Sequence, residues 1–189
     1  GALMKAAAQA EKRWSGNIAC IFDFAGKLSA DEESAGYFSD VVRHTIVNEK
    51  LSAYELLSEI RLKGTYNLAK VSESRKADLW IFYSITSQFG GTSIGAYAAA
   101  NAWQEQYGRF LASSGDNINT VGMSMWKQTG MNSDAQASEA SSRNRGFLEL
   151  EREEGVEYIA FAVETGAGNP LIGIDRNAEP MRRICLDEY

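Results

Sequence analysis

Hydrophobic and polar positions form two kinds of pattern along the chain. Short continuous apolar runs predict strands of a parallel sheet, and longer stretches with apolar residues at helical spacing predict helices. The predicted strands are Asn17–Phe24, Asp78–Ser84, Ile118–Trp126 and Leu171–Ile174. The predicted helices cover residues 3–14, 51–72, 94–112, Phe147–Leu150 and Val156–Glu164, with Glu151–Gly155 as a turn. This alternation predicts an α/β fold in which helices flank a parallel sheet.

The first apolar run, Asn17–Phe24, has no polar alternation apart from one aspartate and ends at Ala25 and Gly26. Such a run predicts a strand that is buried on both faces, followed by a turn. On these residues alone, a core strand with a turn glycine is the favoured interpretation.

Candidate chemistry gathers in the middle of the chain. Ser84 ends a predicted strand, and Tyr97 and Asn101 lie one helical turn apart on the next predicted helix. In parallel α/β sheets, ligands bind beyond the carboxyl ends of the strands. A phenol with a pKa of about 10 acts as an acid near neutral pH when a cation stabilises its phenolate. Ser84 as a cap and Tyr97 as a core tyrosine remain the structural alternatives.

Several segments resemble one family. Its motifs are similar to Phe82-Tyr-Ser84, Phe89-Gly-Gly91, Tyr97-Ala-Ala-Ala-Asn101 and Met123-Ser-Met-Trp126-Lys-Gln-Thr-Gly130-Met131. The chain resembles the ketoreductase (KR) domains of modular polyketide synthases and hybrid nonribosomal peptide synthetases, within the short-chain dehydrogenase/reductase superfamily. The resemblance runs from about Trp14 to Arg183 and matches the second half of such a domain. It implies one domain, residues 1–189, with a Rossmann-like sheet truncated to about four strands.

The resemblance implies a catalytic set. Such domains reduce a ketoacyl thioester on an acyl carrier protein to the hydroxyacyl form with NADPH. Tyr97 would be the acid, Ser84 would orient the carbonyl, and Asn101 would position water or the cation. Where the family has its lysine this chain has Arg61, whose planar fork differs in geometry from an ammonium. The nearest lysine, Lys63, is predicted to lie on the surface.

The resemblance also implies cofactor contacts. The turn at Ala25 and Gly26 would pass close to the ribose. The nicotinamide side would be lined by Trp126, Thr129, Gly130 and Met131. Residues 131–153 would form a substrate lid, in keeping with their many small and polar residues.

The Gly-rich turn that binds a pyrophosphate is expected to be absent from this chain. Thr165-Gly-Ala-Gly168 is similar to it only in letters, because a predicted strand follows instead of a helix. The chain alone is therefore predicted to bind NADPH weakly or not at all and to be inactive. The predicted strand Asn17–Phe24 would have a bare edge, which favours pairing with the missing N-terminal half or with a second copy.

Composition and charge argue against two classes of binding partner. A net charge of -6 argues against binding to nucleic acid or an anionic membrane. No apolar run reaches the roughly 18 residues that cross a bilayer. Cys20 and Cys185 lack metal-ligand spacing, so no metal site is predicted and both cysteines are predicted to be free thiols. Free thiols and the lack of a signal-peptide core favour a cytoplasmic protein.

Two functions remain open from the sequence. Ser84, Tyr97 and Asn101 favour an enzyme, whereas Arg61 and the absent glycine loop favour a catalytically inactive structural domain of a megasynthase. A hydrolase is a poor third hypothesis: Ser93 lies in a Gly-x-Ser-x-Gly segment, but the only histidine, His44, precedes it, opposite to the hydrolase order. Ser93 is predicted to be a turn residue and His44 a surface residue.

Overall fold

The computed structural model describes residues 1–26, 47–89, 95–127 and 145–184. The chain divides into two compact units, Gly1–Val121 and Gly122–Tyr189, and each is considered by itself. The predictions for His44, Ser93, Cys185, residues 129–131 and most of the predicted lid lie outside the described residues. Within the described ranges, no helix has both the length and the apolar character needed to cross a membrane.

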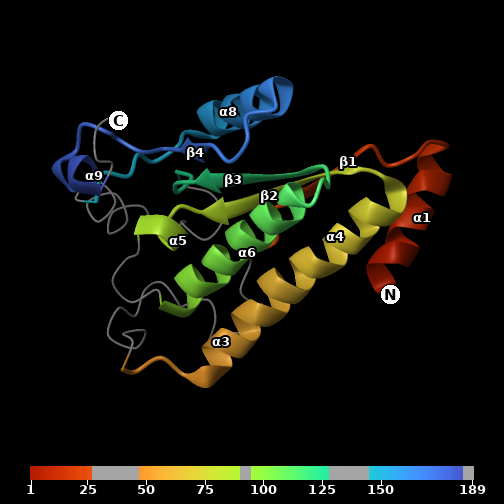
Figure 1. Ribbon diagram of the computed structural model, residues 1–189, viewed down its shortest axis with the longest axis horizontal. Helices are drawn as coiled ribbons and strands as arrows, with labels where there is room; N and C mark the ends of the chain where they lie inside the picture. The colour runs from red at the N-terminus through yellow and green to blue at the C-terminus, as the bar shows by residue number, and fades with distance from the viewer. Residues whose placement is uncertain (27–46, 90–94, 128–144, 185–189) are drawn as a thin grey trace. The chain divides into compact units, whose positions relative to one another are not determined.

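The described strands form a four-stranded sheet in the order β1-β2-β3-β4 (Figure 1). These strands are β1 (Cys20–Asp23), β2 (Asp78–Ser84), β3 (Ile118–Met123) and β4 (Leu171–Ile172). The pairs β1/β2 and β3/β4 are parallel, with Phe22 opposite Trp80 and Gly122 opposite Leu171. The predicted parallel α/β fold is confirmed, with shorter first, third and fourth strands than predicted.

The prediction that the first strand is buried on both faces is wrong. Asp23 is buried on the face of β1 toward α4, whereas Phe22 is 44% exposed and Phe24 is 56% exposed. Phe24 stacks on Phe82 of β2, with ring centroids 4.1 Å apart. The physical reason is the alternation of side chains along a strand, since the described helices cover only one of the two faces here. Among the described strands β1 is at the end of the order, so its outer edge is unpaired there.

The predicted helix 51–72 consists of three consecutive segments. They are α3 (Leu51–Leu57), a π-helix η1 (Ser58–Lys63) and α4 (Gly64–Arg75). A π-turn takes about one residue more than an α-turn, so it shifts the faces that the following residues present. Wide turns of this kind are frequent at functional sites, and this one contains Arg61.

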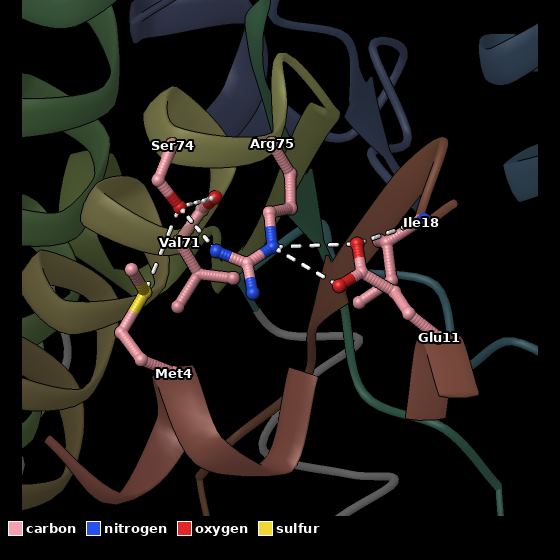
Figure 2. Close-up of polar contacts among 6 residues, drawn as sticks. All are labelled: Met4, Glu11, Ile18, Val71, Ser74 and Arg75. Carbon is pink, nitrogen blue, oxygen red and sulfur yellow. Dashed lines mark hydrogen bonds and ion pairs between the residues drawn. The ribbon is translucent and has the colours of Figure 1, made fainter. Parts of the chain in front are cut away.

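Helix α1 (Ala2–Trp14), predicted as residues 3–14, packs against the C-terminal part of α4. Figure 2 shows the polar contacts: Arg75 Nε donates to both carboxylate oxygens of Glu11 at 3.3 Å. On the same helix, Ser74 Oγ lies 3.6 Å from Met4 Sδ. Glu11 Oε1 also accepts from the backbone N–H of Ile18 at 3.5 Å, so this carboxylate joins α1, the loop before β1 and α4.

Helix α6 (Gly95–Ser113) packs on β2 beside α4 and η1 (Figure 1). The shared core between these helices and the sheet contains Ala69, Leu79, Ile81 and Ile118, flanked by Tyr107 and Leu111. At Gly108 a Cβ atom would lie 2.3 Å from Thr120 Cγ2, so the helix approaches the sheet as closely as a glycine allows. The short helix α5 (Thr86–Phe89) connects to the end of β2 and contacts α6.

The second unit corrects two predictions. Phe147–Leu150 is not a helix, because Phe147 bridges Ile174 and Leu150 bridges Trp126 as isolated β-bridges. Glu151–Gly155 is not a turn: Glu151 is the N-cap of α8 (Arg152–Thr165) and forms a capping box with Glu154. A four-residue apolar run fits either helix or strand, so its pairing partners decide.

The rest of the second unit is short. Gly166 ends α8 in the left-handed conformation, with φ 62°, and β4 follows it in the chain. The described part of the chain ends with α9 (Glu179–Ile184).

Candidate active site

Ser84 is half-buried at the carboxyl end of β2, as predicted. Its hydroxyl oxygen accepts hydrogen bonds from Thr86 Oγ1 at 2.9 Å and from Thr86 N at 3.4 Å. These contacts cap the start of α5, which is the structural alternative for this residue. In both contacts Ser84 is the acceptor, so neither uses its own hydroxyl proton.

Asn101 joins Ser84 to Tyr97 through the backbone. Its side chain is fully buried, its Oδ1 accepts from Ser84 N at 2.7 Å, and its Nδ2 donates to the Tyr97 carbonyl oxygen at 2.7 Å. The amide therefore fixes the end of β2 to the first turns of α6. These contacts make Asn101 a positioning residue for Ser84 and Tyr97, whereas the resemblance implied a contact with water or a cation.

Arg61 lies beside the phenol of Tyr97. Its Nη2 donates to Tyr97 Oη at 3.4 Å, and its Cζ lies 5.0 Å from the centroid of the Tyr97 ring. Arg61 is only 4% exposed, and Tyr97 is buried as well. Lys63 instead forms an exposed ion pair with Glu59 on the same helical segment. The structure therefore brings Arg61, not Lys63, to the phenol.

Three further buried polar side chains adjoin this pair. Arg61 Nη1 donates to Gln104 Oε1 at 2.6 Å, Gln104 Nε2 donates to Thr65 Oγ1 at 2.8 Å, and Thr65 Oγ1 donates to Asp23 Oδ2 at 2.7 Å. This network was not predicted from the sequence. Two signals were present: Asp23 interrupts an apolar strand, and Gln104 falls on the same face of α6 as Asn101, three residues later.

The turn at Ala25 and Gly26 adjoins the same network. Asp23 Oδ1 accepts from the backbone N–H of Ala25 at 3.1 Å. A Cβ atom on Gly26 would lie 2.6 Å from Arg61 Nη2, so the guanidinium occupies the space that a side chain here would need. The predicted cofactor turn and the predicted cation are therefore direct neighbours.

Comparison with known proteins identifies the family. The family model described as the KR domain matches residues 33–128, just over half of the chain. The chain belongs to the KR domain family. The matched range includes Arg61, Ser84, Tyr97 and Asn101.

Related proteins and solved structures are consistent with the assignment of this chain to the KR domain family. Polyketide synthase PksN of Bacillus subtilis (strain 168) is 26% identical over 147 residues, which are 74% of this chain and 3% of PksN. A solved adenylation, ketoreductase and pseudo-Asub multidomain structure of a keto acid-selecting NRPS module has a TM-score of 0.75 at 20% identity, covering 99% of this chain and 15% of that one. A gluconate 5-dehydrogenase from Burkholderia cenocepacia J2315 in complex with NADP and tartrate has a TM-score of 0.69 at 15% identity, covering 93% of this chain and 70% of that one. The two structures share the short-chain dehydrogenase/reductase fold, and this chain spans only 3–4% of its curated relatives.

A second polar cluster fixes α5 of the KR domain to α6. Glu105 is buried, accepts from Gln88 Nε2 at 2.7 Å and pairs with Arg109 at 3.0 Å. Gln88 Nε2 also lies 3.4 Å from Tyr83 Oη. Burial, and secondly the negative charge of Glu105, raise the pKa of Tyr83 above its usual range. Tyr83, next to Ser84, therefore stays a neutral structural group at physiological pH.

Trp126 belongs to the second unit of the KR domain. Its ring lies against Gly155, where a Cβ atom would be 2.6–3.0 Å from three ring atoms, and its backbone bridges Leu150. The other predicted nicotinamide contacts, Thr129, Gly130 and Met131, lie outside the described residues.

Proposed function

We propose that this KR domain is the catalytic part of a ketoreductase that reduces a ketoacyl thioester on an acyl carrier protein to the hydroxyacyl form. The observation that carries the proposal is the buried guanidinium of Arg61 donating to the hydroxyl oxygen of Tyr97. A donor at this position stabilises negative charge on the phenol oxygen, which favours transfer of the phenol proton to a substrate carbonyl.

The residues take the following roles in the proposal. NADPH, when bound, supplies the hydride that reaches the carbonyl carbon. Tyr97 gives its proton to the carbonyl oxygen, and Ser84 orients that oxygen by donating its hydroxyl proton. Asn101 keeps the two side chains in register by tying β2 to α6. Arg61 serves as the cation beside the phenolate that forms.

The proposed cofactor contacts are the ones that the resemblance to KR domains implies. Ala25 and Gly26 contact the ribose, and the nicotinamide side is lined by Trp126, Thr129, Gly130 and Met131. Support comes from the fold shared with a dehydrogenase solved in complex with NADP. The part that holds the pyrophosphate is proposed to be a separate N-terminal half or a second copy, paired along the outer edge of β1, which no described strand covers.

The carrier-bound thioester is proposed from the relatives. PksN is a polyketide synthase, and the solved NRPS module contains a ketoreductase beside its adenylation domain. In such assemblies the proposed substrate arrives on a carrier protein.

One set of contacts favours the alternative of a catalytically inactive structural domain. The Ser84 hydroxyl caps α5, and the Asn101 amide binds two backbone groups. A scaffold that keeps a degenerate site would use these residues in the same way. The reductase would turn over a ketoacyl thioester, whereas the structural domain would not.

The test is NADPH oxidation with a model ketoacyl thioester, measured with the chain alone and with the chain joined to its natural upstream sequence. The reductase proposal predicts turnover in the joined protein and little in the chain alone. A matched reaction with the reduced hydroxyacyl thioester controls for NADPH loss without substrate. Absence of turnover in both proteins would leave the structural domain as the function.

A further inference from the structure

Asp23, Thr65, Gln104 and Arg61 form a continuous hydrogen-bonded chain, named here the Asp23 relay. It connects β1, α4, α6 and η1, and its three bonds measure 2.7, 2.8 and 2.6 Å. All four residues are at most 4% exposed. Every side chain of the relay belongs to the first unit. The relay ends at the Tyr97 hydroxyl, which Arg61 Nη2 contacts at 3.4 Å.

The carboxylate sets the direction of every bond in the relay. An ionised Asp23 can only accept, so Thr65 must give it its single hydroxyl proton. The Thr65 oxygen then accepts from the amide nitrogen of Gln104, which turns the amide oxygen of Gln104 toward Arg61. If Asp23 were neutral, nothing would fix this order, since hydroxyl and amide groups can donate or accept.

The position of the Arg61 guanidinium depends on this direction of the hydrogen bonds. A buried cation needs hydrogen bonds and a compensating charge. In the described part of the chain Arg61 donates to two neutral groups, Gln104 and Tyr97, and its buried Nε has no hydrogen-bond partner there. Gly26 also lies directly against the guanidinium. Among the hydrogen bonds of Arg61 in the described part of the chain, the bond to Gln104 is the shortest, at 2.6 Å against 3.4 Å to Tyr97, so it contributes most to the position of the guanidinium.

We propose that Thr65 and Gln104 are positioning residues, which carry the charge of Asp23 to Arg61 and hold the guanidinium at the Tyr97 oxygen. The effect of the relay on turnover rests on the reductase function proposed above. The ordering of Arg61 by the relay does not. Arg61 acts as the cation of the site because this chain places a glutamine, a threonine and an aspartate behind it.

The sharpest test is a matched pair of substitutions at Thr65. Thr65→Val keeps the shape of the side chain and removes the hydroxyl, whereas Thr65→Ser keeps the hydroxyl and removes a methyl group. The measurement is the NMR spectrum of the guanidinium N–H groups in the 189-residue chain with labelled arginine, with the Arg61 signals assigned by Arg61→Lys. The relay predicts that Thr65→Val shifts or averages the Arg61 signals and that Thr65→Ser leaves them as in the wild type.

A residue that serves only packing would give the opposite ranking, with Thr65→Ser disturbing the signals more than Thr65→Val. That result, or unchanged signals in both variants, would overturn the relay. Asp23→Asn provides a second variant if Thr65→Val does not fold, because it keeps the shape of the side chain, removes the charge and leaves one oxygen acceptor where the carboxylate has two, one for Thr65 and one for Ala25 N. The relay predicts that Asp23→Asn shifts the Arg61 signals although Thr65 and Gln104 lie between the two residues, and unchanged signals would overturn it.

Turnover provides the second readout, in the chain joined to its upstream sequence. Thr65→Val is expected to lower kcat roughly tenfold, the ratio that corresponds to one lost charge-assisted hydrogen bond, with KM for the thioester unchanged. Thr65→Ser is expected to retain the wild-type kcat. If the joined protein shows no turnover at all, the reductase function fails while the NMR ranking still decides the relay.

Discussion

Asn101→Ala tests how the two ends of the site are held together. The substitution removes the acceptor of the Ser84 N–H and the donor to the Tyr97 carbonyl, both at 2.7 Å and both made by a fully buried side chain. A buried N–H left without a partner costs about 1–3 kcal/mol, and the second hydrogen bond contributes about 1 kcal/mol. The higher helix propensity of alanine returns up to about 0.7 kcal/mol. The free energy of unfolding should therefore fall by about 1.3–3.3 kcal/mol.

The assay is urea unfolding followed by far-UV circular dichroism, together with native-state hydrogen exchange at the Ser84 amide. For a chain of this size, the expected loss corresponds to a Tm lower by about 3–13 °C. Protection of the Ser84 amide should fall in the same variant, because its acceptor is the atom that was removed.

Gln106→Ala is the matched control, since Gln106 is exposed on the same helix. It should change the free energy of unfolding by less than about 0.5 kcal/mol. If Asn101→Ala were as stable as Gln106→Ala, with wild-type exchange at Ser84, the proposed tie between β2 and α6 would be refuted.

Three further predictions follow from other parts of the fold. Gly155→Ala should destabilise the second unit by about 1–2 kcal/mol in denaturant titrations followed by tryptophan fluorescence, because the new Cβ would overlap the Trp126 ring. Because the pKa of Tyr83 is raised in the folded protein, the phenol of the unfolded chain loses its proton at lower pH than the folded one. The free energy of unfolding should therefore fall above about pH 10, by up to about 1.4 kcal/mol per pH unit from this group. Urea titrations should show a smaller fall in Tyr83→Phe. Arg75→Met should remove about 1 kcal/mol by breaking the half-buried pair with Glu11, and limited trypsin digestion should cleave α1 faster.

Controls for these predictions lie in the same chain. Gly168→Ala places a Cβ in open space and should change stability by less than about 0.5 kcal/mol. Lys63→Met breaks an exposed ion pair and should leave the digestion rate of α1 unchanged. Equal effects of each control and its test substitution would contradict the corresponding contact. An equal alkaline loss in wild type and Tyr83→Phe would contradict the pKa assignment.

The strands and helices that carry the candidate site were predictable, because each has a strong local signal. The apolar run that ends at Ser84 and the alanine-rich helix of Tyr97 and Asn101 are both present where the sequence predicts them. Phe147–Leu150 was predicted wrongly because a run of four residues carries no full helical period, and its bridges to Trp126 and Ile174 are long-range.

The details of the site depended on contacts that one sequence does not reveal. A π-turn differs from an α-turn by about one residue, so apolar spacing over 51–72 could not locate it. The burial of Gln104 and Thr65 follows from how α4 and α6 pack on the sheet, and their hydrogen bonds span about forty residues of sequence. The exposed face of β1 was missed for a similar reason, since an apolar run indicates burial but does not show which face is covered.

The central claim is that Tyr97 delivers the proton when the carbonyl is reduced. The most direct measurement is the single-turnover rate of NADPH oxidation with a ketoacyl thioester, in the chain joined to its upstream sequence, for Tyr97→Phe and for the control Tyr158→Phe, whose ring is exposed on α8. The account predicts that Tyr97→Phe lowers this rate by at least about a hundredfold, as for loss of a general acid, while Tyr158→Phe retains it. A Tyr97→Phe rate within about twofold of the wild type would contradict the claim.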